Sequence, residues 1–271
     1  PMSESPLRCS RDGAVAHVEF ARPETMNALT FDGIAQLAAH VEELARDATV
    51  RCLVLTSTGR HFTSGMHLDE FFGGGVQLDV DTSRARLRLR DNLSTLMRHF
   101  DVLDAAPFPV IAAIQGGCIG GGVDLVAACD LRLCSADAFF SIQEINVGLV
   151  ADLGTLQRLP KLIPPGVVRE YAYTGRRMTA DRALAVGLVN AVHATHDELR
   201  EAAFALAREI AQKSPLAIAG TKLAINYARD HGTREALEHM AVLQAAILSP
   251  DDMRVAIEAV RTKRAPAFPD R

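Results

Sequence analysis

The stretch "VIAAIQGGCIGGGVDL" (residues 110–125) reads as a buried strand, a glycine-rich loop and the beginning of a helix. A short run of Val, Ile and Ala suits a strand that is buried on both faces. The glycines either let a helix pack closely on a sheet or leave main-chain N–H groups at a helix N-terminus uncovered. A phosphate loop is not indicated, since no Lys-Ser or Lys-Thr pair follows and the pattern G-x-G-x-x-G is absent. Uncovered N–H groups suit a carbonyl oxygen that becomes an enolate oxygen, and both explanations stay open at this point.

The first half of the chain alternates predicted strands with predicted helices. Segment 30–47 has its apolar residues at helical spacing, with Thr30 placed to cap it, and segment 89–109 ends at two prolines. The predicted strands are "AVAHVEFA" (14–21), "VRCLVLTS" (50–57) and "FPVIAAI" (108–114). Strands that alternate with helices in this way predict an α/β fold with a mostly parallel sheet.

After about residue 160 amphipathic helices follow one another. They cover 198–212, 215–231, 234–248 and 251–263, and each has a broad apolar face. We therefore expect a core with the ligand site over residues 1–195 and a C-terminal helical region over 196–271. Such a tail can cover its own core, pack on a neighbouring subunit, or do both.

Composition limits the classes of partner. The 271 residues are 48% hydrophobic and 23% charged, with a formal net charge of −4 and no Lys/Arg run. These values argue against nucleic acid and anionic membranes as partners, and no apolar run is long enough for a spanning helix. The five cysteines form no C-x-x-C pair, and the ends resemble neither a secretory signal nor a peroxisomal address. We expect a cytoplasmic protein.

A second loop, "TGRHFTSGMHLDEF" (58–71), also leaves a predicted buried strand. Ser64, Gly65 and Met66 can bring another free main-chain N–H to the same place, although a plain connection explains them as well. His61 and His67 have no metal-ligand spacing, so no metal site is indicated.

Three acids lie in apolar surroundings: Asp124 after the glycine loop, then Glu144 and Asp152 in "EINVGLVADLGTLQRLP" (144–160). Burying a carboxylate costs several kcal/mol unless it is paired or protonated. Each acid has a structural explanation. Ser141 to Glu144 fits a capping box, and Asp152 fits an N-cap. Asp124 is placed in a first helical turn, where the helix dipole stabilises its negative charge. Taken singly, each structural role is at least as good an explanation as catalysis.

These segments together resemble the crotonase family, also called the enoyl-CoA hydratase/isomerase superfamily. The resemblance runs from "VEFARPETMNAL" (18–29) through both loops to "GLVADLGTLQRLPKLI" (148–163) and the helical tail. It implies a crotonase (ClpP-like) fold of repeated ββα units, with C-terminal helices that assemble trimers or hexamers. It also implies that the N–H groups of Met66 and Gly121 hold the thioester oxygen of an acyl-CoA. The implied substrate-binding residues are Ser64, Gly65, His67, Leu68, Gly122 and Arg22.

The acids point to a reaction within that family. Asp124, Glu144 and Asp152 together resemble the Δ3,5-Δ2,4-dienoyl-CoA isomerase subgroup, which serves the β-oxidation of unsaturated fatty acids. The resemblance implies Glu144 as base at C2, Asp152 as acid at C6 and Asp124 as a group that orients or tunes the pair. It implies no metal or redox cofactor, because CoA enters as part of the substrate. The alternatives are enoyl-CoA hydration and, less favoured by three retained acids, a non-catalytic binding protein.

Two features depart from the pattern or extend it. His67 stands where the family commonly has Asp, which alters the loop on the thioester side. The apolar stretch around Asn146 and Val150 is expected to line the acyl pocket, and "FFGGGVQLD" (71–79) is expected to be a flexible loop over it.

Overall fold

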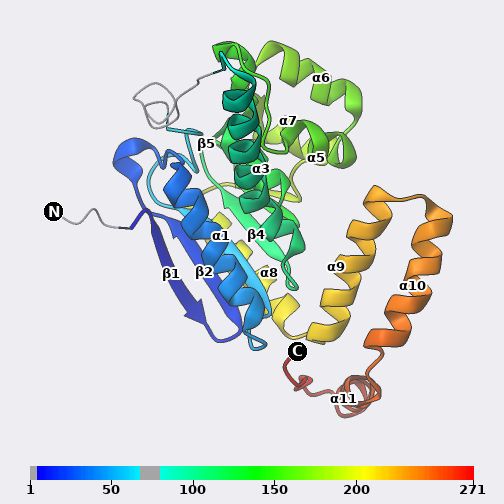
Figure 1. Ribbon diagram of the computed structural model, residues 1–271. Coiled ribbons are helices and arrows are strands. Elements are labelled where there is room, and N and C mark those ends of the chain that lie inside the picture. Colours follow the sequence, from blue (N-terminus) through cyan, green and yellow to red (C-terminus); the bar gives the residue numbers. More distant parts are fainter. Residues whose placement is uncertain (1–4, 68–79) are drawn as a thin grey trace.

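The computed structural model describes residues 5–67 and 80–271, and its main sheet is mostly parallel (Figure 1). The strand order is β1-β2-β3-β4-β6-β9, in which only the β1–β2 pair is antiparallel. The strands are Leu7–Asp12 (β1), Val15–Phe20 (β2), Cys52–Ser57 (β3), Val110–Ile114 (β4), Leu131–Ser135 (β6) and Ala191–His193 (β9). The α/β fold class predicted from the sequence is confirmed.

Helices cover both faces of this sheet, which explains why its central strands are apolar throughout. Helices α1 (Phe31–Arg46) and α3 (Ser83–Ala105) lie on one face, and α8 (His196–Ala211) lies on the other. Leu53 and Leu55 of β3 join the core under α1 and α3, whereas Cys52 and Val54 join the core under α8. This alternation is the two-residue period of a strand buried on both sides.

A smaller three-stranded sheet carries the elements of the candidate site. Strand β5 (Gly117–Ile119) pairs in parallel with β7 (Phe139–Ser141), which pairs with β8 (Met178–Thr179). The helices beside it are α4 (Gly121–Ala127), α5 (Thr155–Leu162), α6 (Pro165–Thr174) and α7 (Ala180–Val186), with the 3-10 helices η1 (Pro23–Thr25) and η2 (Gln143–Val147). The glycine-rich loop therefore contains a short strand as well as the predicted helix start.

The C-terminal helices α9 (Pro215–Asp230), α10 (Thr233–Ile247) and α11 (Pro250–Thr262) extend away from the sheet (Figure 1). The expected division at residue 196 falls at the first residue of α8, which packs on the sheet. Lys222 fastens α9 to the core, since its buried Nζ donates to the carbonyl oxygens of Leu103 (2.9 Å) and Phe108 (3.1 Å) and to Asp130 Oδ2 (2.7 Å). Large apolar side chains stay exposed on these helices: Leu223, Ile225, Leu237, Val242, Met253, Ile257 and Val260.

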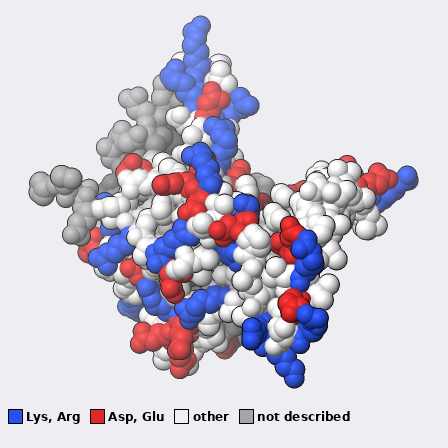
Figure 2. Space-filling model, turned by 90° about the horizontal axis from the view of Figure 1, so that it is seen from below, with Lys and Arg blue, Asp and Glu red and all other residues white. Residues whose placement is uncertain are grey.

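Charge is spread without a field of one sign over the face in Figure 2, where basic and acidic side chains alternate. Within the described residues, no helix is both long enough and apolar enough to span a bilayer.

Candidate active site

Two loops from different strands run side by side to form the candidate oxyanion site. Thr63 N–H donates to the Gly117 carbonyl (3.1 Å), and Ile119 N–H donates to the Thr63 carbonyl (3.2 Å). Gly65 has φ +91°, and a Cβ there would stand 2.7 Å from the Ile119 carbonyl oxygen. Only glycine fits this approach, so the loop after β3 is fixed against β5.

Glycines of the glycine-rich loop (116–122) make the same contact from the other side. A Cβ on Gly122 would overlap the Cγ2 methyl of Thr63, and one on Gly121 would meet Met66 Cγ at 3.2 Å. His61 Nδ1 accepts a hydrogen bond from Gly117 N–H (2.8 Å), which adds a third link. The packing explanation of the glycines is confirmed, and it is the packing that sets Met66 beside Gly121.

The two N–H groups assigned to the oxyanion hole are both open. Leu29 bonds to the residues on either side of Met66, accepting from His67 N–H (2.8 Å) and donating to the Gly65 carbonyl (2.8 Å). This pairing leaves the Met66 N–H without an acceptor among residues 5–67 and 80–271. Gly121 is the first residue of α4, where an N–H has no partner within its own helix. A carbonyl oxygen placed between them would receive two hydrogen bonds.

Asp124 is the most deeply buried of the three acids. It lies in the first turn of α4 with 1% of its surface exposed, and its Oδ1 accepts from the Thr155 N–H (2.6 Å). Its Oδ2 is buried without a hydrogen-bond partner among the described residues. Burial, and then the Asp152 charge, raise the pKa of Asp124 to about 6, against the hydrogen bonds from Thr155 and the charge of Arg158.

Glu144 lies in η2 and faces the glycine loop. Its Oε2 is buried and unpaired within the described chain, and a Cβ on Gly120 would stand 3.2 Å from Oε1. Burial raises its pKa to about 7, and the charges of Asp124 and Asp152 add to the rise. Such a carboxyl exchanges its proton near neutral pH, which suits a general base or acid.

Asp152 lies in the loop before α5 and is the most open of the three. Its side chain is exposed to solvent in the single chain, yet the surrounding protein removes enough water to raise its pKa. The capping explanations for the last two acids are wrong. The residues at the N-caps of η2 and α5 are Ile142 and Gly154, and neither helix has a side-chain cap.

Exposed apolar side chains surround Glu144 and Asp152 in sequence. Ile145, Val147, Leu149 and Val150 are between 44% and 71% exposed. An aliphatic chain laid over them would bury apolar area and remove water from the nearby carboxyls.

The remaining candidate residues are spread over the loops. Ser64 N–H donates to the Met26 carbonyl (2.9 Å). Arg22 N–H donates to Asn27 Oδ1 (2.9 Å) in the turn that follows β2. His67 is partly buried next to Met66. Leu68 and the 71–79 segment lie outside the described residues.

Known proteins resemble this chain over nearly all of its length. The sequence profile of the enoyl-CoA hydratase/isomerase family matches residues 10–271. The chain belongs to this family, and its fold is the crotonase fold.

Particular relatives are dienoyl-CoA isomerases by name. The chain is 43% identical over 252 residues to the mitochondrial Δ(3,5)-Δ(2,4)-dienoyl-CoA isomerase of Mus musculus, covering 92% of this chain and 77% of the mouse protein. It is 37% identical to the peroxisomal isomerase of Arabidopsis thaliana, covering 97% and 95%. Among solved structures, an enoyl-CoA hydratase from Bacillus anthracis superposes with a TM-score of 0.88 at 28% identity, covering 97% and 98%.

Proposed function

We propose that this protein isomerises 3,5-dienoyl-CoA to 2,4-dienoyl-CoA, as an enzyme of unsaturated fatty-acid oxidation. The observation that carries the proposal is the presence of three acids, rather than two, around one oxyanion site. Glu144 and Asp152 are eight residues apart, on either side of an exposed apolar segment. Two carboxyls spread along an acyl chain suit a reaction that moves a proton from one carbon to another several bonds away.

The first step removes a proton from C2. The Met66 and Gly121 N–H groups bind the thioester oxygen, and Glu144 takes the proton as a general base. The electron pair of the broken C–H bond moves into a dienolate whose negative oxygen is held by the two donors. A base with its pKa near 7 is both ionised in part and strong enough to draw a weakly acidic proton.

The second step adds a proton at C6. Asp152 donates it, the dienolate electrons form the new C–H bond, and the 2,4-diene remains conjugated with the thioester. An acyl chain over Asp152 removes further water from its carboxyl, which favours the protonated form. Net, one proton leaves C2 and one enters C6, so no redox cofactor enters the balance. CoA takes part as the carrier of the acyl group.

Enoyl-CoA hydration is the second candidate, favoured by one observation. Asp124 Oδ2 and Glu144 Oε2 are both buried and unpaired in the described structure, as two groups that hold a water between them would be. Hydration of a 2-enoyl-CoA, however, leaves Asp152 without a chemical role.

An absorbance time course on a 3,5-dienoyl-CoA separates the two. Isomerisation creates a chromophore by conjugating the diene with the thioester, whereas hydration of a 2-enoyl-CoA destroys one. We expect growth of the dienoyl signal with the wild-type protein and a loss of about 100-fold or more with Asp152→Asn. No signal on the diene together with rapid hydration of a 2-enoyl-CoA would establish the hydratase instead.

We also propose that the protein assembles into trimers or hexamers through its C-terminal helices. The support is the set of exposed apolar side chains on α9, α10 and α11, which a monomer would leave in water. Analytical ultracentrifugation tests it, with a change such as Val260→Glu expected to lower the mass. The cytoplasmic location stays a prediction, to which the five free cysteines add the expectation of a reducing compartment.

A further inference from the structure

Two buried oxygen atoms on residues that are hydrogen-bonded to each other have no partner in the described structure, and the proposed proton transfers use neither of them. One is Asp124 Oδ2 and the other is Thr155 Oγ1. Both residues are 1% exposed, and they already share a bond, from Thr155 N–H to Asp124 Oδ1. A buried hydroxyl and a buried carboxylate oxygen without partners are each unfavourable, because neither recovers the hydrogen bonds it made to water.

The Thr155 hydroxyl is close to the carboxyl that needs a donor. As placed, it misses hydrogen-bond geometry, but it lies near enough to oppose the rise in the pKa of Asp124. A change of the Thr155 χ1 angle would move Oγ1 and bring the two unpaired atoms together, and the hydroxyl hydrogen could then turn to Asp124 Oδ2. Asp124 then receives two hydrogen bonds from one residue, a pattern that favours the ionised carboxyl.

Charges from every neighbouring element act on Asp124. Glu144 on η2 and Asp152 before α5 are negative and oppose ionisation, while the buried Cys118 thiol on β5 stays neutral. Arg158 on α5 is positive and favours ionisation. The amino end of α4, whose first turn contains Asp124, favours it too.

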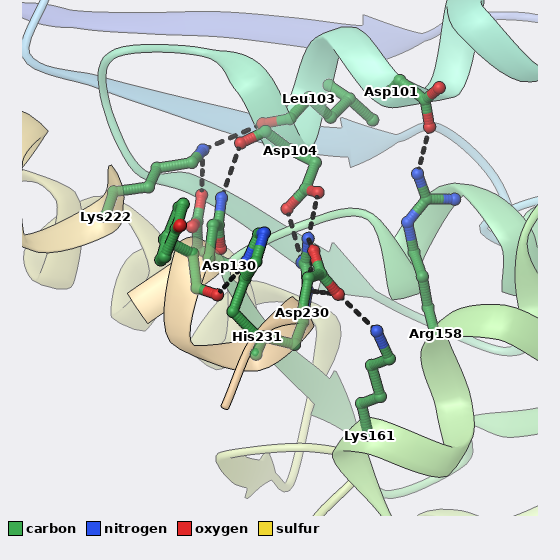
Figure 3. A network of polar contacts seen from close by, with 12 residues as sticks. Asp101, Leu103, Asp104, Asp130, Arg158, Lys161, Lys222, Asp230 and His231 are labelled. Carbon is green, nitrogen blue, oxygen red and sulfur yellow. Dashed lines mark hydrogen bonds and ion pairs between the residues drawn. The ribbon is translucent and has the colours of Figure 1, made fainter. Parts of the chain in front are cut away.

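Helix α5, which begins with Thr155, is paired with two other helices. Figure 3 shows Arg158 reaching Asp101 of α3 and Lys161 reaching Asp230 of α9, so successive turns of α5 are tied to different helices. Asp230 also pairs with Arg229, which makes a two-bond contact with Asp104 of α3 (2.9 Å each). The residues of α5 that follow Thr155 are thus paired with α3 and α9.

We propose that Thr155 is a positioning residue of this site: its main-chain N–H and its hydroxyl together hold Asp124 as an ionised carboxylate beside Glu144. The consequence for catalysis rests on the proposed function. An ionised Asp124 makes Glu144 harder to deprotonate and therefore a stronger base at C2. Thr155 acts through Asp124 and touches neither the substrate nor the reacting atoms in this account.

The test removes the hydroxyl and keeps the main-chain N–H. Thr155→Val does so at almost constant volume, Thr155→Ala does so with no added crowding, and Thr155→Ser retains the hydroxyl. The titration of Glu144 is followed by NMR of protein with ¹³C-labelled glutamate carboxyls, and Glu144→Gln assigns the signal. We expect Thr155→Val and Thr155→Ala to lower the titration midpoint of the Glu144 carboxyl by roughly half a pH unit. Asp124→Asn should lower it further, and Ser should leave it near the wild-type value.

The pH dependence of kcat/KM on the dienoyl substrate gives the second reading. The acidic limb of this profile should move to lower pH in Thr155→Val and Thr155→Ala, and it should keep its wild-type position in Thr155→Ser. If both readings stay unchanged in Val and Ala while the protein only becomes less stable, Thr155 is structural and the proposal is overturned. A wild-type protein without isomerase activity whose Glu144 midpoint still moves as expected would overturn the proposed function and leave the Thr155 assignment standing.

Discussion

Replacing Glu144 by glutamine should make the folded protein more stable at pH 8, although it removes the proposed base. Burial raises the pKa of Glu144 to about 7 from the model-peptide value of 4.5. The folded state therefore binds a proton between these values that the unfolded state releases. Stability is lost as the pH rises through this window and is fully present below it. A neutral glutamine of the same shape has no charged form to bury.

The magnitude follows from the size of the pKa difference. Each unit is worth about 1.36 kcal/mol, so a rise of roughly 2.5 units corresponds to about 3 kcal/mol at pH 8. For a chain of this size that is roughly 6–12 °C in Tm. At pH 5 the folded-state carboxyl is protonated, and the gain should fall to less than about 1 kcal/mol. The pH dependence of the gain separates a buried charge from a simple change in packing.

Thermal unfolding of wild type and Glu144→Gln at pH 5 and pH 8, at equal protein concentration, measures the effect. Glu170→Gln is a matched control, because Glu170 is an exposed residue of α6. We expect the Tm gain of Glu144→Gln to be several times larger at pH 8 than at pH 5, and no change for the control. A gain of equal size at both pH values, or a loss at pH 8, would refute the reasoning that Glu144 is held against its preferred charged state.

Three further predictions concern the loops, the tail and pH. Gly122→Ala should push the glycine-rich loop away from Thr63, destabilise the protein by about 1–3 kcal/mol and reduce kcat/KM, as measured by melting and the absorbance assay; unchanged kinetics would contradict it. Lys222→Met should cost about 3–5 kcal/mol because it leaves Asp130 buried without its partner, and Asp130→Asn in the same chain should recover most of that loss in melting experiments. The dienoyl rate should fall about tenfold per pH unit well below pH 7, as Glu144 takes up a proton; a flat profile down to pH 5 would show that Glu144 is not the base.

Strands β3 and β4 of the central sheet are predictable from sequence because they are buried on both faces. Segments 50–57 and 108–114 are apolar runs that match β3 and β4. Strand β1 is missed because five of its six residues are exposed, and β9 is missed because it has three half-buried residues. Strand β1 is held by a hairpin with the adjacent β2, and β9 by parallel pairing with β6 far along the chain, so their own residues carry little strand signal.

The candidate site is predictable in part, for reasons that its contacts explain. The glycines of 116–122 predict close packing, and in the structure they allow the loop after β3 to pack against the glycine-rich loop. Taken alone, Glu144 and Asp152 are equally compatible with helix caps, and only the structure removes that explanation. Thr155 is missed because it reads as an ordinary first residue of a helix, while its partner Asp124 is 31 residues away. The raised pKa values of the three acids come mainly from burial by segments far along the chain, which the residues next to each acid do not predict.

Deuterium labelling in heavy water tests the central claim most directly. With wild-type protein and a 3,5-dienoyl-CoA, the account predicts a 2,4-dienoyl product with one deuterium at C6. Asp152→Asn should still exchange the C2 proton of the substrate while forming almost no product, because Glu144 remains, and Glu144→Gln should lose both. Product labelled at C6 at the wild-type rate from Asp152→Asn, or C2 exchange that survives Glu144→Gln, would contradict the assigned division of labour between the two acids.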